Sequence, residues 1–154
     1  MQRTALAAII AGLFTLPVQA QDIPLLDEIV VTATRVPTQL QRIASDVTVI
    51  RREQIEASGQ TSLVEMLRGV AGVEINQIGG AGATSSLFIR GANAQHTLLL
   101  VDGVRMNSAT LGSPRLEHLP LGLIERIEVV RGPMSQLYGS DAIGGVIQIF
   151  TRKG

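Results

Sequence analysis

The strongest constraint on the fold is a short stretch, residues 97–101, that is apolar at four consecutive positions and leads directly into the dipeptide Asp102-Gly103. A strand with one face in water alternates between apolar and polar side chains, whereas a strand buried on both faces is apolar throughout. We therefore expect residues 97–101 to form a strand in the middle of a sheet. The Asp-Gly pair is a strong turn signal, and the chain is expected to return as a short strand over residues 104–107.

The rest of the chain contains short strands and helices separated by glycines. The clearest helix signal is Ser62, which forms a capping box with Glu65 three positions later, and Gly69 marks the end of that helix. The expected strands cover residues 46–50, 73–78, 87–91 and 124–130, the expected helices cover 51–57 and 62–68, and a turn or short helix covers 119–123. These elements predict the α+β class, with a small mixed β-sheet and short flanking helices.

The first twenty residues are typical of a signal peptide. Arg3 gives a positive start, residues 5–16 are apolar or small, and the stretch ending at Ala20 has the small residues that a signal peptidase recognises. Cleavage is expected after Ala20, with an uncleaved membrane anchor as the alternative. Residues 21–44 carry scattered charges, two prolines and no sustained periodicity, which predicts a flexible arm. A globular unit is expected over residues 45–144.

Composition argues against several classes of function. Thirteen Lys and Arg balance thirteen Asp and Glu, so the overall charge does not indicate a nucleic-acid partner. The absence of cysteine excludes disulfides and thiolate metal sites, and His96 and His118 lie apart with no carboxylate pattern around them. The glycine-rich stretch 79–86 lacks the lysine of a phosphate-binding loop, and no catalytic motif is present. We expect no enzyme activity, no metal and no cofactor.

Four segments occur in an order that is more specific than any one of them. They are Asp27-Glu-Ile-Val-Val-Thr-Ala33, Leu87-Phe-Ile-Arg-Gly91, Leu100-Val-Asp-Gly-Val104, and residues 124–153 with Arg131-Gly-Pro133 and Tyr138-Gly-Ser-Asp-Ala-Ile-Gly-Gly145. In this order they resemble the plug domain of TonB-dependent outer-membrane receptors, the substrate-gated transporters of Gram-negative bacteria. The resemblance implies the plug fold. The transmembrane barrel that surrounds such a plug is expected to be absent from this chain, because aromatic residues are scarce and one segment alone has the pattern of a barrel strand.

The resemblance implies a role for the arm. Its β-prone run behind two acids is similar to the TonB box, which the energy-transducing protein TonB recognises by strand addition. Backbone hydrogen bonds then supply the affinity, so a preference for extended chain matters more than any particular side chain. The residues expected to bind TonB are Asp27, Glu28, Ile29, Val30, Val31, Thr32 and Ala33. The alternative is an ordinary edge strand.

Within the family, the chain is most similar to the cobalamin receptors, through its short box, its compact arm and residues 79–94. In those receptors apical plug loops touch the ligand, which implies two loops here, at residues 78–86 and 106–113. The expected ligand-binding residues are Ile78, Ala83, Thr84, Ser85, Ser86, Met106, Asn107, Ala109, Leu111 and Gly112. Their hydroxyl, amide and backbone groups suit a large neutral polar ligand, and no cationic cluster is available for an anionic ferric chelate. A ferric siderophore is the alternative ligand.

The resemblance also implies a partner for the globular unit, a 22-stranded outer-membrane barrel. Four charged residues on or beside strands are expected to face its wall: Arg90, Arg126, Glu128 and Arg131. Residues 145–154 are expected to start the first barrel strand. We expect the protein in the outer membrane of a Gram-negative bacterium, as a truncated or split receptor, and the alternative is a free-standing periplasmic binding module. With a modest core and solvated charges, the isolated chain is expected to fold weakly.

Overall fold

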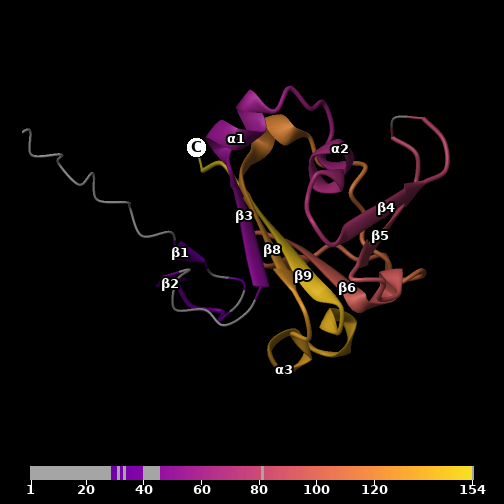
Figure 1. The fold of residues 1–154 in the computed structure, drawn as a ribbon. Helices are drawn as coiled ribbons and strands as arrows, with labels where there is room; N and C mark the ends of the chain where they lie inside the picture. Colours follow the sequence, from indigo (N-terminus) through magenta and orange to yellow (C-terminus); the bar gives the residue numbers. More distant parts are fainter. Residues whose placement is uncertain (1–28, 31, 33, 40–45, 81, 154) are drawn as a thin grey trace, which may run out of the picture.

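The computed structural model describes residues 29–30, 32, 34–39, 46–80 and 82–153. Its centre is a five-stranded sheet with the strand order β3-β8-β9-β6-β7 (Figure 1). The strands are β3 (Asp46–Arg51), β6 (Thr97–Val101), β7 (Val104–Arg105), β8 (Ile124–Arg131) and β9 (Gly145–Thr151). β9 is parallel to β6, and the other neighbouring strands are antiparallel. The sheet is therefore mixed, and the predicted α+β class is confirmed.

The middle strand of this sheet is β9. Val146, Ile147 and Ile149 are completely buried, as expected for a strand with a neighbour on each edge and a covering layer on each face. The prediction that residues 145–154 start a barrel strand differs from this arrangement, because β9 belongs to the sheet of the globular unit itself. An extended apolar segment is required in both places, so the local pattern could not distinguish them.

The apolar run at residues 97–101 forms β6 with the predicted bounds. Leu98, Leu99 and Leu100 are buried on both sides of the sheet. The strand lies one position from the centre, between β9 and the two-residue edge strand β7. Burial on both faces was thus predictable from the sequence, whereas the neighbouring strands were not.

The two faces of the sheet are covered by different elements. On one face α1 (Arg52–Ala57), α2 (Leu63–Arg68) and the hairpin of β4 (Val73–Gln77) and β5 (Ser85–Ile89) enclose the larger core. The opposite face carries a smaller core that includes Leu98, Leu100, Val130 and Val146. It is covered by α3 (Ser135–Tyr138) and the 3-10 turn η4 (Ser140–Ala142), which follow β8 in the chain. Two further 3-10 turns, η2 (Ala94–His96) and η3 (Leu121–Leu123), precede β6 and β8.

The helices are short, and their ends are defined by local hydrogen bonds. Ser62 caps α2 as predicted, since its Oγ accepts from the Glu65 N–H at 3.2 Å. Glu65 Oε2 in turn accepts from the backbone N–H and the hydroxyl of Thr61, at 3.1 and 3.0 Å. These bonds, the backbone one first, lower the pKa of the Glu65 carboxyl, so this contribution to stability is lost as the pH falls through that lowered value. Among the residues described, no helix is long and apolar enough to cross a membrane.

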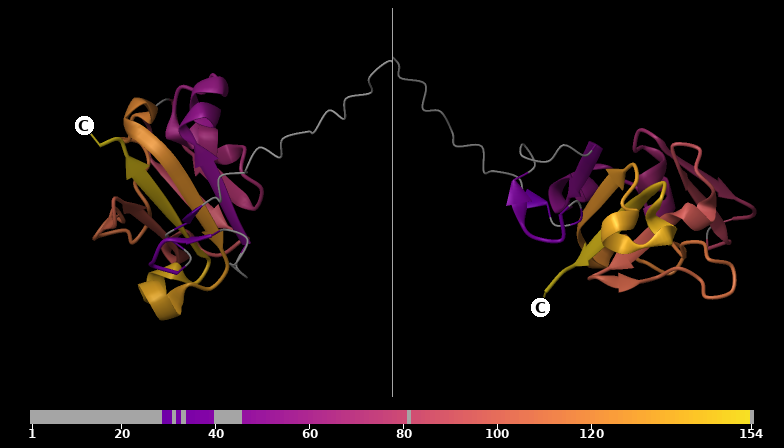
Figure 2. Two further views of the ribbon diagram at one scale, coloured as in Figure 1. Left: turned by 90° about the vertical axis from the view of Figure 1, so that its left-hand side faces the viewer. Right: turned by 90° about the horizontal axis from the view of Figure 1, so that it is seen from below.

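Two strands of the arm, β1 (Ile29–Val30) and β2 (Thr38–Gln39), pair with each other in antiparallel register. In Figure 2 these violet strands lie beside the sheet, near the end that carries α3. Thr32, between them in the chain, contacts the globular unit through the hydrogen bonds described below.

A pair of glycines allows β9 to enter between β8 and β6. A Cβ atom on Gly145 would collide with the backbone carbonyl oxygen of Val130 and would lie 3.0 Å from a side-chain carbon of Ile89. A Cβ atom on Gly144 would lie 2.7 Å from the Cβ of Ala92. The start of β9 therefore requires residues without side chains.

We expect Gly145→Ala to lower the free energy of unfolding by about 1–3 kcal/mol, the usual cost of forcing extra atoms into a packed site. Gly122→Ala is the matched control, because a Cβ atom on the exposed Gly122 meets nothing within 4 Å and should change stability by less than about 0.5 kcal/mol. Urea unfolding followed by circular dichroism measures both variants. Equal stability of the two would show that the close approach of β9 to Val130 is not required.

Candidate functional site

The arm residue Thr32 is completely buried. Three side chains of the globular unit bind it: Glu128 on β8, Gln148 on β9 and Tyr138 at the end of α3. Glu128 and Gln148 lie opposite each other in the β8–β9 register, on the face of the sheet that carries the smaller core. We call these three side chains the Thr32 slot.

Every hydrogen-bonding group of Thr32 is used in the slot. Its backbone N–H donates to Glu128 Oε2 at 2.8 Å, and its hydroxyl lies 2.7 Å from the same oxygen and 3.1 Å from Gln148 Oε1. The Thr32 carbonyl oxygen accepts from the Tyr138 hydroxyl at 2.9 Å. The hydroxyl carries one proton, so the two acceptors share it, and the charged carboxylate is the stronger acceptor.

The Glu128 side chain is completely buried, which is costly for a carboxylate unless it is paired and hydrogen-bonded. Its Oε1 accepts from Arg126 Nε at 2.9 Å. The Arg126 guanidinium lies over the ring of Phe150, 3.7 Å from its centroid, in a cation–π contact. Thr32 therefore supplies donors to one carboxylate oxygen, while Arg126 neutralises the other.

Tyr138 connects the arm to the end of α3. Burial raises the pKa of its phenol, so the hydroxyl is protonated at neutral pH and donates to the Thr32 carbonyl oxygen. The guanidinium of Arg35, also in the arm, lies 4.6 Å from the centroid of the Tyr138 ring. The arm is thus held at Thr32 and at Arg35 by the same aromatic residue.

The predicted TonB-binding segment is only partly covered by these contacts. Ile29 and Val30 form β1 and pair with Gln39 and Thr38, and Thr32 is in the slot. Asp27, Glu28, Val31 and Ala33 lie outside the described residues.

The two predicted ligand loops line two separate cavities. Residues of the first loop, with the start of α2 and residues 116–120, line a cavity of about 550 Å³. Residues of the second loop, with Gln95 and Asp141, line one of about 510 Å³. In the first loop Ile78 is 86% exposed, whereas Ser85 is buried, and its hydroxyl has no hydrogen-bond partner within the described part of the chain. Neither cavity brings the two loops together.

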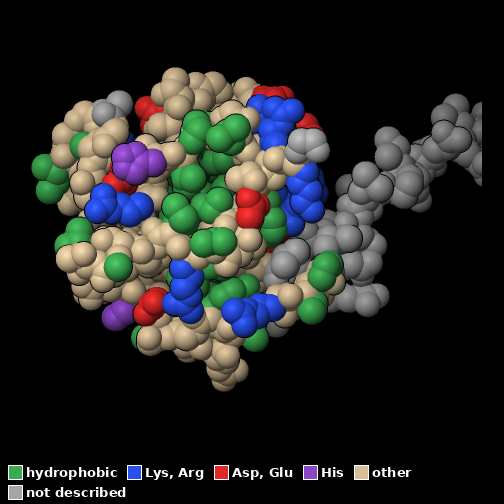
Figure 3. Space-filling model, turned by 180° about the vertical axis from the view of Figure 1, so that it is seen from behind, with side chains coloured by type: hydrophobic (Ala, Val, Ile, Leu, Met, Phe, Trp, Pro, Cys, Tyr) green, Lys and Arg blue, Asp and Glu red, His purple; other side chains and the backbone are tan. Residues whose placement is uncertain are grey.

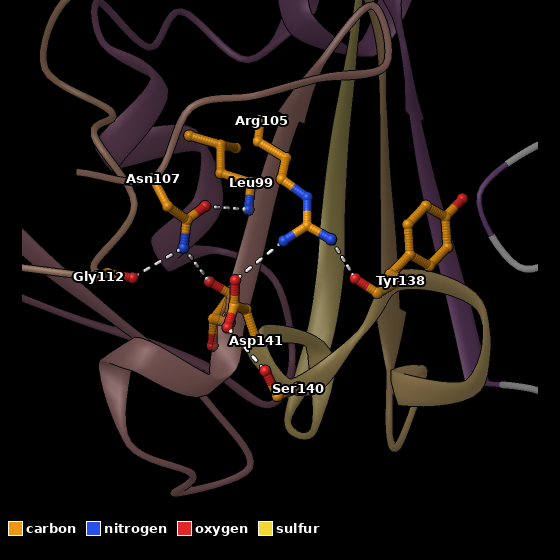
Figure 4. A network of polar contacts seen from close by, with 8 residues as sticks. Leu99, Arg105, Asn107, Gly112, Tyr138, Ser140 and Asp141 are labelled. Carbon is orange, nitrogen blue, oxygen red and sulfur yellow. Dashed lines mark hydrogen bonds and ion pairs between the residues drawn. The ribbon is translucent and has the colours of Figure 1, made fainter. Parts of the chain in front are cut away.

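The second loop is held by Asn107, whose side chain points toward the backbone of Leu99 and Gly112 (Figure 4). Its Oδ1 accepts from the Leu99 N–H at 3.0 Å, and its Nδ2 donates to the carbonyl oxygens of Thr97 and Gly112 at 3.0 and 2.9 Å. This side chain therefore stabilises the loop. Its neighbours Met106, Ala109 and Leu111 are exposed.

A family model described as TonB-dependent Receptor Plug Domain matches residues 39–146. The chain belongs to this family. The identification that the four sequence segments predicted is thereby confirmed, and the globular unit with its mixed sheet is a plug domain.

Known relatives of this plug are transporters and receptors. It is 46% identical over 154 residues to the vitamin B12 transporter BtuB of Vibrio vulnificus (strain CMCP6), covering 98% of this chain and 25% of that protein. The siderophore receptor PirA of Acinetobacter baumannii is similar at a TM-score of 0.57 and 33% identity, over 70% of this chain and 17% of that one. A mutant ferric enterobactin receptor PfeA of Pseudomonas aeruginosa, in complex with enterobactin, is similar at a TM-score of 0.59 and 30% identity. The similarity covers 72% of this chain and 18% of that one. The chain spans about a quarter of the length of the curated relatives it matches.

Two of the four charges predicted to face a barrel are buried inside the plug. Glu128 is in the Thr32 slot, and Arg131, 7% exposed, donates to the Ala71 carbonyl oxygen at 2.7 Å and to Asp46 at 2.9 Å. The expectation that these two side chains are solvated is therefore wrong, because their partners lie in this chain. Arg90 and Arg126 are 54% and 31% exposed, and for them a position against a barrel wall stays a prediction.

The slot residues Tyr138 and Gln148 were not among the predicted site residues. A signal for the slot does exist, since Glu128 and Gln148 each interrupt a run of buried apolar residues, at 127–130 on β8 and at 146–149 on β9. Two such interruptions on paired strands indicate a polar contact inside the sheet, but the pairing register is needed to bring them together. Among the residues described, no group of three or more His, Cys, Asp or Glu side chains could hold a metal ion.

We expect Asn107→Ala to loosen the second loop, because it removes three hydrogen bonds and leaves the Leu99 N–H without its acceptor. The free energy of unfolding should fall by about 1–3 kcal/mol, and proteolysis between residues 107 and 113 should accelerate. Thr110→Ala, in the same loop and exposed, is the control and should leave both unchanged. If Asn107→Ala were cleaved no faster than the control, the loop would be held by other contacts.

Proposed function

We propose that this plug is the gate of an outer-membrane active transporter in a Gram-negative bacterium. It would fill the lumen of a 22-stranded barrel, and its arm would couple the gate to TonB. Two observations on the arm carry this proposal. Within the described residues, β1 has a neighbour on one edge only, which suits strand addition by a partner, and Thr32 ties the same segment to the plug.

Gating then follows from a shift between two states of the arm. A ligand favours the state with the arm released only if it binds that state more tightly than the docked one. The family consists of receptors, and the sequence offers no catalytic motif, so the chain is proposed to act by binding and conformational change. The residues proposed for the TonB contact are those of the box, residues 27–33.

For the ligand we favour cobalamin. The curated relatives at 45–46% identity are vitamin B12 transporters, and the two loops offer hydroxyl and backbone groups that suit a neutral polar ligand. On the face seen in Figure 3, Lys and Arg side chains are spread around an apolar centre and do not form one basic patch. A ferric siderophore is the second candidate, because solved structures at 30–33% identity are siderophore receptors.

A free-standing periplasmic module is the rival from another class. The neighbouring coding sequence discriminates between them. A downstream frame that encodes some twenty amphipathic strands, each of about ten residues, would favour a split or truncated receptor. Lack of such a frame or of any barrel continuation would favour the rival.

We expect Val30→Pro to weaken binding of the periplasmic domain of TonB at least about tenfold, because proline removes a backbone donor from the added strand. Val30→Ala keeps that donor and should bind within about threefold of the unchanged chain. Titration calorimetry measures both affinities, and circular dichroism checks that the plug stays folded. If the proline variant bound as tightly as the alanine variant, the arm would not be recognised by strand addition.

The ligand is tested by replacing the plug of a vitamin B12 transporter with this one and measuring uptake in cells. We expect cobalamin-dependent growth to be restored, because the apical loops would complete the ligand site of a matched barrel. The same exchange into a siderophore receptor, assayed with ferric siderophore, is the control and should fail. Rescue by ferric siderophore alone would reverse the order of the two candidates.

A further inference from the structure

The Thr32 slot holds the arm by its backbone as well as by a side chain. The Thr32 N–H donates to Glu128 and the Thr32 carbonyl oxygen accepts from Tyr138. An added strand bonds to its neighbour through the N–H and carbonyl groups of alternate residues. A pairing register that includes Thr32 among them requires these same two groups. While Thr32 is in the slot, neither group is available to a partner strand.

We propose that Glu128, Tyr138 and Gln148 form an internal docking site that competes with the incoming partner strand for the backbone of Thr32. The identity of that partner as TonB rests on the proposed function, whereas the docking itself does not. The site is specific, because it combines an acceptor for the N–H, a donor for the carbonyl and two acceptors near the hydroxyl. The arm is available for pairing only in the fraction of molecules in which Thr32 has left it.

Glu128 is the main determinant of this competition. Its bonds to Thr32 are charge-assisted, and such bonds are roughly twice as strong as the neutral backbone bonds that a partner strand offers. Arg126 stays on the other carboxylate oxygen, so the charge keeps one partner when Thr32 leaves. Water can then replace the Thr32 donors at the carboxylate.

The chain contains no cysteine and therefore no disulfide that could hold the arm. Within the described residues, the arm outside the slot bonds mostly to itself, through Thr34, Val36 and Thr38. Among the described arm residues, Arg35 also contacts the plug, over the Tyr138 ring. Removal of slot bonds should therefore directly change the docked fraction, which is the fraction of molecules with Thr32 in the slot.

Two variants test the site without changing the arm. Glu128→Gln keeps the size of the side chain and removes its charge, and Tyr138→Phe removes only the hydroxyl while the ring still faces Arg35. Glu117→Gln is the matched control, because Glu117 is another carboxylate whose side chain is almost fully buried, at 3% exposed, and is paired with Arg115. Amide hydrogen exchange of the full chain, resolved at Thr32 by NMR, measures the docked fraction, and protection of β8 and β9 checks folding.

Exchange at Thr32 and affinity for the partner should change by the same factor. Fast reclosing makes the exchange rate proportional to the open fraction, and the apparent Kd is inversely proportional to that fraction. We expect Glu128→Gln to raise the exchange rate about tenfold and to lower the Kd of the periplasmic domain of TonB by the same tenfold. Tyr138→Phe should act in the same direction with a smaller factor, and Glu117→Gln should change neither quantity.

Unchanged exchange at Thr32 in both slot variants, with β8 and β9 still protected, would overturn the docking site. Faster exchange with an unchanged Kd would overturn the competition. If no form of the chain bound TonB, the proposed partner would fall, while faster exchange in the slot variants would still support the docking site. If a variant lost protection in β8 and β9, the other variant would decide.

Discussion

The five-stranded sheet depends on the insertion of β9 between β8 and β6. These two strands do not neighbour each other in the strand order, so without β9 the sheet would separate into the pairs β3–β8 and β6–β7. The parallel pairing of β9 with β6 joins residues far apart in the chain, such as Leu98 and Val146. Contacts of this kind form late, because a long loop must close first. Both cores of the plug use side chains of β9, so neither is complete until this strand is in place.

The same insertion creates the polar site on one face. The β8–β9 register places Glu128 opposite Gln148, between the apolar residues Val49 on β3 and Leu100 on β6. A buried ion pair is often no more stabilising than apolar residues of the same size, whereas a buried carboxylate without partners is strongly destabilising. Stability alone therefore does not explain Glu128. Its position is better explained by the arm, since a carboxylate can exchange the donors of Thr32 for water and can tolerate both states.

Local patterns predicted the elements better than their arrangement. The bounds of β6, the cap at Ser62 and the end of α2 at Gly69 follow from short-range chemistry and are present in the structure. The place of β9 and the burial of Glu128 and Arg131 depend on which strands are neighbours, which a period-two pattern does not specify. The sequence pattern alone predicts that a charged residue in a strand lies at the surface. Its burial is intelligible only when Thr32, 96 residues away, is known to bind it.

Long-range polar contacts also decide what the predicted ligand loops can do. The resemblance implies ligand contact for Asn107, and its amide is already bonded to Leu99, Thr97 and Gly112. Residue type gives the groups that a side chain offers, but only the fold shows which groups are already used. The exposed residues of the second loop are therefore the better candidates for contact with a ligand.

Tyr138 connects this second loop to the arm. Its hydroxyl donates to the Thr32 carbonyl oxygen, and its own carbonyl oxygen accepts from Arg105, which also pairs with Asp141 at 2.9 Å (Figure 4). Arg105 immediately precedes the second loop and lines the same cavity as Asp141. A displacement of Arg105 or Asp141 would therefore act on the residue that holds Thr32, through bonded neighbours and without a change in the apolar core. Such a chain of contacts transmits a signal only if one of its members has two alternative arrangements, and Thr32, docked or released, is the member whose bonds could be replaced by water or by a partner strand.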